Sequence, residues 1–334
     1  MTSKAFCVIS PITELPKCIA NAAGDRASCA DCHANCAPQP NATRTANEKV
    51  ALDSFFNSTK GIDGWVHTCS DGWHPPADAC TRHGVTCDIS RQFVEKLDLS
   101  GCGLTGTIPA GSIFTIKGLL EINFANEYYA SERGLTGTLP SDLASAVQLE
   151  KLTLNGNSLV GTIPDLINLT SLQLIDLHYN KFIGPLPNIA STDTTYISFA
   201  RNGFTGTIPS SWSALINVSI FGLANNKLSG TADIITKFPK LLVVFLRNNS
   251  FTGEIPKLPD TTAVADFDHN AFSSIAAGIC SPKAPPAFGT PCGCSSDYPN
   301  QPFATCCFAN NKFVKPTTSC LQVTDLLCVC VAVL

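Results

Sequence analysis

The segment LEKLTLNGNSLVGTIP, residues 149–164, decides the fold because copies of it recur along the chain and align without gaps. The later copies are LQLIDLHYNKFIGPLP (172–187), TTYISFARNGFTGTIP (194–209), VSIFGLANNKLSGTAD (218–233) and LLVVFLRNNSFTGEIP (241–256). Two copies precede it, at 94–109 and 119–140, the second with about six extra residues, and a degenerate copy lies around 266–272. One asparagine column, with spacings of 21 to 24 residues, runs through Asn157, Asn180, Asn202, Asn226, Asn249 and Asn270. The pattern predicts about eight structural repeats.

Each column of the repeat has a physical explanation. Alternating apolar residues such as Leu152 and Leu154 predict a short strand with one buried face. A buried asparagine amide bonds the backbone of the neighbouring coil, which satisfies groups that the turn leaves without partners. Gly161 permits the next bend, and Pro164 closes the coil where no ladder donor is needed. Because each unit buries its apolar edge only against its neighbours, the sequence predicts a solenoid with a parallel sheet on its concave side.

Composition excludes several classes of protein. Of the 334 residues 44% are hydrophobic and 14% are charged, against about 25% charged residues in a typical soluble domain. The chain is too apolar, and its net charge of -4 too small, for intrinsic disorder. With 22 basic and 26 acidic residues it has no cationic field for phosphates, so we expect no nucleic-acid partner.

The repeats resemble a known family. The pattern LxxLxLxxNxLxGxIP, from Val94 to Ser274, is similar to the plant-specific leucine-rich repeat of receptor-kinase ectodomains and secreted polygalacturonase-inhibiting proteins. The resemblance implies an α/β solenoid, a right-handed superhelix with a concave parallel β-sheet and disulfide-rich caps.

The residues from Val50 to Asp88 resemble the N-terminal cap of that family. Trp65 or Trp73 would then seal the first coil, and Cys80 and Cys87 match the paired cysteines of the cap. The family usually has tryptophan where Arg82 stands, two residues before a Gly-Val dipeptide.

Four regions follow from these patterns: a Cys-rich N-terminal segment (1–46), a cap (47–93), the repeats (94–275) and a Cys-rich C-terminal region (276–334). At the N-terminus, Pro11 and Glu14 interrupt the apolar stretch before a signal peptide can form. The chain ends in LLCVCVAVL (326–334), which is too short to span a bilayer. Two interpretations remain open: truncation before a membrane anchor, and the last apolar element of a crosslinked cap.

Cysteines mark the two ends of the chain. Nine lie between Cys7 and Cys102, eight between Cys280 and Cys330, and none in the 177 residues between. Such clusters favour an oxidising compartment. Five glycosylation sequons agree with an extracellular or cell-surface location: Asn41, Asn57, Asn168, Asn217 and Asn248.

The total of 17 cysteines is odd, and Cys102 occupies the asparagine column of the first repeat. We therefore expect Cys102 to be a buried free thiol and the other cysteines to form five to eight disulfides. Setting it aside leaves Cys80 with Cys87, eight C-terminal cysteines, and six N-terminal ones that include Cys69.

Motifs that carry chemistry are few. Cys29-Ala-Asp-Cys32-His33 matches the CxxCH pattern of haem attachment, and with Cys36 it also offers four zinc ligands. A knot of disulfides that also draws on Cys36 is the favoured interpretation, because other cysteines surround the motif and Met1 is the only methionine that could serve as an axial haem ligand. His67, His74 and His83 fall in the cap, where packing or solvent-facing roles are expected. The sequence holds no hydrolase or phosphate-binding motif, so we predict neither enzymatic activity nor a cofactor.

Side chains that alternate with the buried strand leucines point outward on the concave face. Aromatic residues and arginine most often anchor interfaces. The predicted ligand-binding residues are Tyr179, Tyr196, Arg201, Phe245 and Arg247, together with Asp176 and His178. Tyr128 and Tyr129, in the insertion 127–133, would extend this patch, and the alternative is that the insertion is a local elaboration without a ligand.

The sequence therefore predicts a recognition module, similar to a receptor ectodomain, that binds a protein, peptide or glycan. A secreted inhibitor of a glycoside hydrolase is the alternative. A third hypothesis is an ice-binding solenoid, since a threonine ladder at strand spacing follows the repeat glycines: Thr107, Thr138, Thr162, Thr207 and Thr231.

Overall fold

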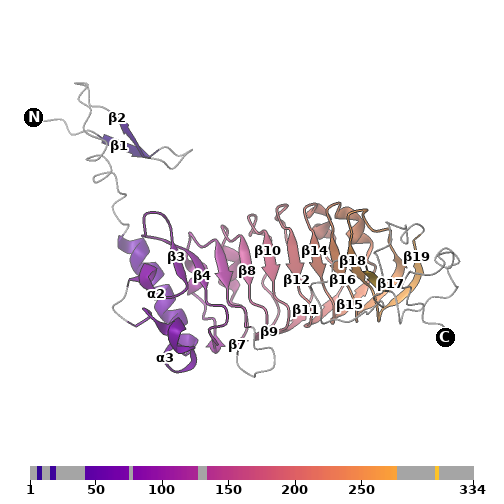
Figure 1. Cartoon of the computed structure of the whole chain (residues 1–334), viewed down its shortest axis with the longest axis horizontal. Helices are drawn as coiled ribbons and strands as arrows, with labels where there is room; N and C mark the ends of the chain where they lie inside the picture. Colours follow the sequence, from indigo (N-terminus) through magenta and orange to yellow (C-terminus); the bar gives the residue numbers. More distant parts are fainter. Residues whose placement is uncertain are drawn as a thin grey trace, which may run out of the picture.

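The computed structural model describes residues 6–9, 16–19, 42–74, 78–126, 134–276 and 305–307. The repeats wind into a solenoid with two long sheets (Figure 1). Each complete repeat contributes one strand to each sheet, so a strand pairs with its equivalents in the repeats before and after it. The predicted solenoid is confirmed. A separate antiparallel pair joins β1 (Phe6–Ile9) to β2 (Pro16–Ile19).

The ten-stranded sheet holds the strands that precede the asparagine column. Its repeat strands are parallel and in register, with Ile175 opposite Leu152 on one side and Ile197 on the other. Only its first pair, β3 with β4, is antiparallel. The strands in spatial order are β3 (Val85–Cys87), β4 (Val94–Asp98), β6 (Glu121–Asn123), β8 (Lys151–Thr153), β10 (Leu174–Asp176), β12 (Tyr196–Ser198), β14 (Ile220–Gly222), β16 (Val243–Phe245), β18 (Val264–Asp266) and β20 (Thr305–Cys307).

The eight-stranded sheet holds the strands that follow the asparagine column. Its strands alternate a buried apolar residue with an outward one, as Phe204 and Thr205 do. In spatial order they are β5 (Gly106–Thr107), β7 (Leu135–Gly137), β9 (Ser158–Gly161), β11 (Lys181–Gly184), β13 (Gly203–Gly206), β15 (Lys227–Gly230), β17 (Ser250–Ile255) and β19 (Ala271–Ile275).

Short 3-10 turns return the chain from the second sheet to the first. Pro140 and Pro209 stand directly before two of them, where a fixed φ and a missing N–H are tolerated. Each turn buries at least one large apolar residue, such as Leu143 or Trp212. The turns are η3 (Ile113–Thr115), η4 (Ser141–Ser145), η5 (Ser210–Ala214) and η6 (Asp233–Lys237).

A narrow apolar core fills the space between the sheets and the turns. Aromatic rings extend the leucine columns, and Phe199 stacks on Trp212 with ring centroids 5.9 Å apart. Phe182 and Phe204 stack along the other sheet at 6.2 Å. All four side chains are fully buried. Most apolar residues of the described repeats thus lie inside a long core.

The asparagine side chains join successive coils. The Asn180 carboxamide oxygen accepts the N–H of Leu159, 3.0 Å away, and its nitrogen donates to the carbonyls of Leu154 and Leu177 at 2.9 and 3.1 Å. The same pattern of an accepted N–H and two donated bonds recurs at Asn157, Asn202, Asn226, Asn249 and Asn270. The ladder satisfies backbone groups that have no partner within their own coil.

The cap covers the first coil with aromatic side chains. It comprises α2 (Ala42–Ser58), α3 (Gly61–Gly64), η1 (His67–Ser70) and η2 (Ala79–Thr81). Phe55 of α2 stacks on Phe124 at 4.9 Å. Trp65 and Trp73 are both buried, with ring centroids 5.0 Å apart, so the two tryptophans seal this end together.

Arg82, at the position where the family has tryptophan, is buried against the same ring cluster. Its guanidinium lies 5.1 Å from the Trp73 ring centroid and donates to Asp53 at 2.6 Å. A cation over an aromatic face is attracted by the ring quadrupole. An ion pair and a cation–π contact therefore replace apolar packing there. In the described part of the chain, Arg82 Nε and Nη1 have no hydrogen-bond partner.

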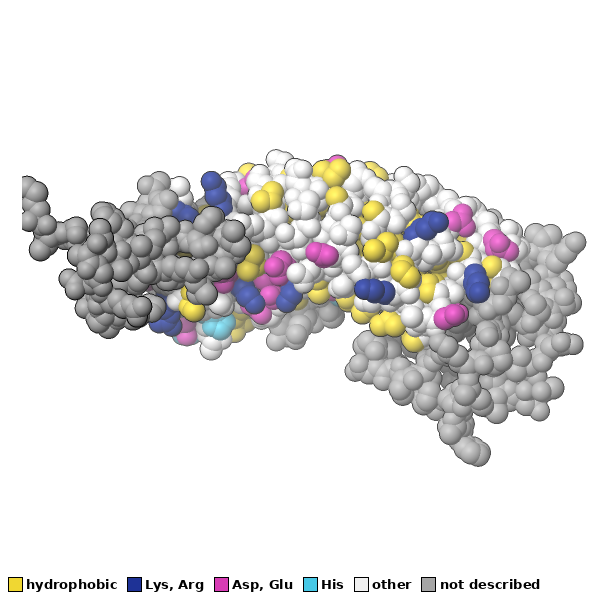
Figure 2. Space-filling model, turned by 90° about the horizontal axis from the view of Figure 1, so that it is seen from above, with side chains coloured by type: hydrophobic (Ala, Val, Ile, Leu, Met, Phe, Trp, Pro, Cys, Tyr) yellow, Lys and Arg dark blue, Asp and Glu magenta, His cyan; other side chains and the backbone are white. Residues whose placement is uncertain are grey.

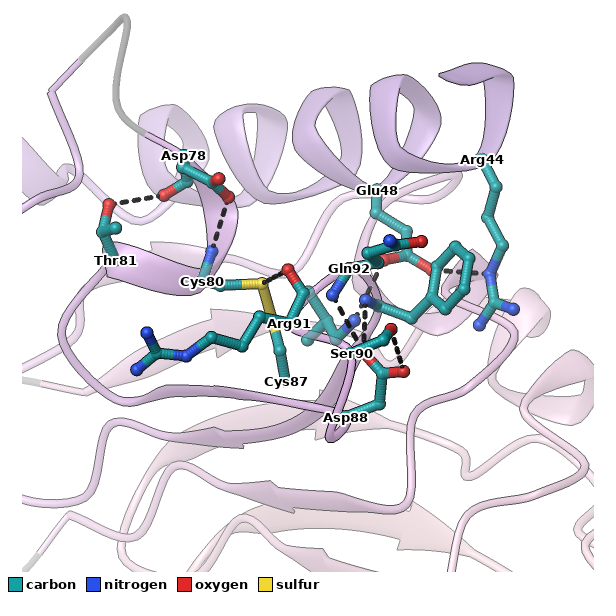
Figure 3. The surroundings of a disulfide bond; sticks show 12 residues. Arg44, Glu48, Asp78, Cys80, Thr81, Cys87, Asp88, Ser90, Arg91 and Gln92 are labelled. Carbon is teal, nitrogen blue, oxygen red and sulfur yellow. Dashed lines mark hydrogen bonds and ion pairs between the residues drawn. A yellow bond between two sulfur atoms is a disulfide. The ribbon is translucent and has the colours of Figure 1, made fainter. Parts of the chain in front are cut away.

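One contact joins α2 to the first repeat, and a second group of contacts shapes the cap loop just before that repeat (Figure 3). Glu48 accepts Arg44 Nε and the N–H of Val94, both at 3.0 Å. Burial acts to raise the pKa of Asp88, but bonds from the Ser90 hydroxyl and the Phe93 and Gln92 N–H groups outweigh it and lower that pKa. Several donors thus stabilise the charged carboxylate that shapes this loop.

Two disulfides lie in the described residues. Cys80 pairs with Cys87, as the resemblance implies (Figure 3). Cys102 pairs with Cys69 across a Cα separation of 5.7 Å, so the prediction of a free Cys102 is wrong. In the first coil the asparagine column faces the cap, and Cys69 of η1 meets it there. Five cysteines, an odd number, then remain between Cys7 and Cys36.

Candidate functional site

The outward face of the ten-stranded sheet brings together most residues predicted to bind a ligand. Charged side chains are sparse on the molecule, as Figure 2 shows for one face. On this sheet they concentrate near its two ends. At the N-terminal end Glu121 lies 3.5 Å from Lys96 Nζ and 3.2 Å from Lys151 Nζ, so charges of opposite sign neutralise one another across three neighbouring strands.

Asp176 organises the middle of the sheet. Its carboxylate lies 2.6 Å from His178 Nδ1 and accepts the Tyr196 hydroxyl at 3.3 Å. Asp176 is 9% exposed, so these neighbours cover it almost completely. The structure thus joins three of the predicted residues into one hydrogen-bonded cluster that fixes the direction of the Tyr196 ring.

Tyr179 and Arg201 lie in the turns after their strands and not within the sheet. Both have left-handed backbones, with φ of 56° and 55°. Their N–H groups donate to Ala200 and Ala224, which continues the ladder through the turns. The Arg201 guanidinium lies 4.5 Å from the Tyr179 ring centroid. These two residues therefore form a stacked pair at the rim of the sheet.

Phe245 and Arg247 lie toward the other end. Phe245 is 38% exposed, more than the other phenylalanines whose burial the structure describes. Arg247 lies 3.9 Å from the buried carboxylate of Asp268, which also contacts His269 Nδ1 at 2.8 Å. Phe245 and Arg247 lie two residues apart at the end of β16 and in the turn after it, and both are residue types that often anchor interfaces.

Asp266 adds a second acidic group beside Asp268. Burial raises the pKa of Asp266, although the N–H of Asp268 and the charge of Arg247 act to lower it. The Asp268 N–H lies 3.0 Å from the Asp266 carboxylate. This end of the sheet therefore holds a carboxyl group that is protonated more readily than an ordinary aspartate.

An apolar column connects the two clusters, and sequence reasoning found only its member Tyr196. On each strand from β10 to β18 the first outward residue is apolar or aromatic and half-buried: Leu174, Tyr196, Ile220, Val243 and Val264. Beside it the small residues Ser198 and Gly222 are paired across β12 and β14. In the sequence, the aliphatic members of the column look like core residues. When the repeats are aligned on their asparagines, these members fall at a position whose side chain points outward.

The outward face of the eight-stranded sheet is different in chemistry. Its exposed threonines flank the repeat glycines and include Thr107, Thr136, Thr138, Thr162, Thr205, Thr207 and Thr231. The methyl groups of Thr107, Thr138, Thr162, Thr207 and Thr231 each cover the glycine of the next coil. Lys181 and Lys227 are the exposed cations at the start of its strands.

Several predicted features fall outside the sheets. Asn57, Asn168 and Asn248 are exposed, and Asn217 is half-buried and bonded to Thr192 and Lys240. Asn41, the Cys29–Cys36 cluster and the tyrosines of the insertion lie outside the described residues. None of the helices described is long and apolar enough to cross a bilayer.

Comparison with known proteins identifies the repeats. The Leucine Rich Repeat family model matches residues 93–112 and 148–169. The chain is 38% identical over 210 residues to Receptor-like protein kinase 7 of Arabidopsis thaliana, which covers 61% of this chain and 18% of that protein. It is 30% identical over 283 residues to Receptor-like protein 32 of the same plant, covering 70% and 32%. The chain thus spans about a third or less of these relatives.

Two solved structures share the fold. The complex titled PEPR1-AtPEP1 matches with a TM-score of 0.51 and 23% identity, over 68% of this chain and 35% of that chain. A plant ice-binding protein matches with a TM-score of 0.51 and 21% identity, over 68% of this chain and 80% of that chain. At these identities the likeness concerns the path of the backbone.

Proposed function

We propose that this chain, whose repeats are leucine-rich repeats like those of plant receptor-like proteins, is an extracellular or cell-surface module that binds a peptide or protein on its ten-stranded sheet. One observation carries the proposal. The apolar column from Leu174 to Val264 crosses five neighbouring strands and has a charged cluster at each end. A partly exposed apolar stripe with polar borders is typical of a protein interface.

The column suggests how a ligand lies. Strands about 4.8 Å apart make a stripe about 19 Å long, which suits an extended peptide or the edge of a folded partner. Tyr196 and Phe245 would provide aromatic contacts, and Arg247 would meet an acidic or carbonyl group of the ligand. Glycan binding is less well supported, because the aliphatic side chains at the centre of the column offer no hydrogen bonds.

The test compares a variant of the column with a matched control. Ile220→Lys introduces a charge on the ten-stranded sheet, and Ile183→Lys does so at an exposed isoleucine of the other sheet. We expect immobilised wild-type protein and Ile183→Lys to retain the same ligands from an extracellular extract of the source organism, and Ile220→Lys to lose them. Tyr196→Ala and Arg247→Ala should weaken retention of the same species. Equal retention by all five proteins would reject the proposed face.

A second candidate function rests on the other sheet. Thr105-Gly106-Thr107, Thr136-Gly137-Thr138 and Thr205-Gly206-Thr207 repeat one pattern on three of its strands. Regular hydroxyl and methyl groups at strand spacing suit an ordered water lattice. Measured thermal hysteresis that disappears in Thr205→Tyr would support ice binding, and none at high protein concentration would exclude it. The inhibitor alternative has no comparable observation in its favour.

A further inference from the structure

The cap holds a cluster of soft metal ligands that the proposed ligand face does not use. The sulfurs of Cys69 and Cys102 and a ring nitrogen of His83 all lie within 4.8 Å of one another. Cys69 belongs to η1, His83 lies between η2 and β3, and Cys102 lies in the turn after β4. Three segments that are separate in the sequence therefore meet at one point, where the cap joins the first repeat.

Backbone hydrogen bonds fix the positions of these three residues independently of the disulfide. The Cys69 N–H donates to Val66 at 2.8 Å, and the Val66 N–H donates to the Cys102 carbonyl at 2.9 Å. The His83 N–H donates to Asp71 at 3.0 Å, and its carbonyl accepts Trp73 Nε1 at 3.0 Å. None of these bonds involves sulfur, so reduction of the disulfide leaves them in place.

The ligand types and the geometry suit zinc. Thiolate sulfur binds Zn²⁺ at about 2.3 Å and imidazole nitrogen at about 2.0–2.1 Å, so tetrahedral ligands lie about 3.5–3.8 Å apart. The observed separations need shifts of about 1–2 Å to reach that geometry, and the Cα atoms of the two cysteines are 5.7 Å apart. Both cysteines are buried and His83 is exposed, and a water molecule would be the fourth ligand, as in zinc sites with three protein ligands.

We propose that Cys69, His83 and Cys102 form a redox-dependent zinc site. A dithiol reductant supplies two electrons and two protons, the disulfide becomes two thiols, and the reductant becomes a disulfide. Zn²⁺ then displaces the two thiol protons and accepts the neutral imidazole nitrogen as its third protein ligand. The cap stays crosslinked to the first repeat in both states, by sulfur–sulfur bonding when oxidised and through the metal when reduced.

The whole chain is the material for the test, and because its terminal regions hold further cysteines, each result is read as a difference between matched variants. The protein is reduced with dithiothreitol, freed of reductant without oxygen, and titrated with Co²⁺ and then Zn²⁺. His83→Asn removes one proposed ligand, and His67→Asn is the matched control on an exposed histidine of the same cap. We expect the wild type and His67→Asn to bind one ion more than His83→Asn does.

Thermal unfolding gives a second readout. Zinc should raise the unfolding temperature of the reduced wild type by several degrees, or restore folding if reduction has abolished it. His83→Asn should gain less, while its oxidised form unfolds at the wild-type temperature because the disulfide does not need the imidazole. The double variant Cys80→Ser/Cys87→Ser should keep the zinc response. Equal stoichiometry and equal zinc response in wild type and His83→Asn would overturn the proposal, as would loss of the response in the double variant.

Discussion

At the scale of single residues, the asparagine amides are the polar groups on which the coils most depend. Each amide forms hydrogen bonds with backbone groups of two successive coils. Water cannot replace these bonds where the amide is buried; Asn180, for example, is only 8% exposed. An apolar substitution therefore leaves a buried donor and buried acceptors without partners.

We expect Asn180→Ala to lower the free energy of unfolding by about 2–3 kcal/mol, because the N–H of Leu159 loses its acceptor in a buried position. The exposed side chain of Asn188 bonds to the Ser211 and Asp165 side chains, and Asn188→Ala should change stability by less than about 0.5 kcal/mol. Urea denaturation of the two variants measures the difference. Similar losses would show that burial of the amide is not the cause.

The buried carboxyl of Asp266 makes stability depend on pH. Its pKa is higher in the folded than in the unfolded chain, so the folded state binds the proton more readily and stability rises as pH falls through that window. Asp266→Asn should therefore stabilise the protein at pH 7, and this gain should shrink as pH approaches the ordinary aspartate value of about 3.9. Denaturation at a series of pH values checks the trend, with the exposed Asp193→Asn as control. A gain that grows toward acid pH would contradict it.

At the scale of elements, the strands of the eight-stranded sheet depend on glycines with left-handed backbones. Gly184 and Gly206 have φ of 83° and 81°. A Cβ on Gly184 would lie 2.8 Å from the Thr162 methyl, whereas a Cβ on Gly206 would meet nothing within 4 Å. Pro185, which holds the threonine position of the preceding coil, explains this difference.

Substitution by alanine separates the backbone effect from the steric one. Gly206→Ala should lower stability by about 1–2 kcal/mol through its positive φ alone. Gly184→Ala should lower it by about 1 kcal/mol more, because Thr162 must move. Adding Thr162→Ser to Gly184→Ala should recover that extra loss in a denaturation experiment. Equal losses of stability in the two alanine variants would mean that Thr162 can move away from the new methyl group without a measurable loss of free energy.

The repeat period predicted most of this architecture, because one spacing sets the strand positions, the register and the buried columns together. The outward apolar column was harder to predict. In the run Leu172-Gln-Leu174-Ile175-Asp-Leu177, four apolar residues compete for one buried face, and only the register with neighbouring coils shows that Leu174 points out. The disulfide partner of Cys102 could not be predicted either, because the contact between the cap and the first coil occurs once and produces no repeating sequence pattern.

At the scale of the whole molecule, two disulfides fasten the cap to different extents. Cys69 and Cys102 are 33 residues apart and Cys80 and Cys87 are 7 apart. The chain-entropy relation assigns about 3.8 kcal/mol to the longer loop and about 2.5 kcal/mol to the shorter. Only the longer crosslink joins the cap to a repeat.

We therefore expect Cys69→Ala/Cys102→Ala to destabilise the protein more than Cys80→Ala/Cys87→Ala does, by about 1 kcal/mol. Denaturant unfolding of the oxidised proteins measures both values, and proteolysis of the cap should accelerate only in the first variant. A larger loss of stability in Cys80→Ala/Cys87→Ala would mean that the disulfide within the cap restricts the unfolded chain more than the one that joins the cap to the first repeat.

The insertion at 127–133 has a consequence for how such a molecule changes length. Strands β6 and β8 remain paired in register although extra residues separate them along the chain, with Glu121 opposite Lys151. Adjacent coils thus pair through equivalent strands, whatever the number of residues that separates these strands along the chain. Duplication or deletion of a whole repeat in the gene would then lengthen or shorten the surface in steps of about 4.8 Å without requiring a new core.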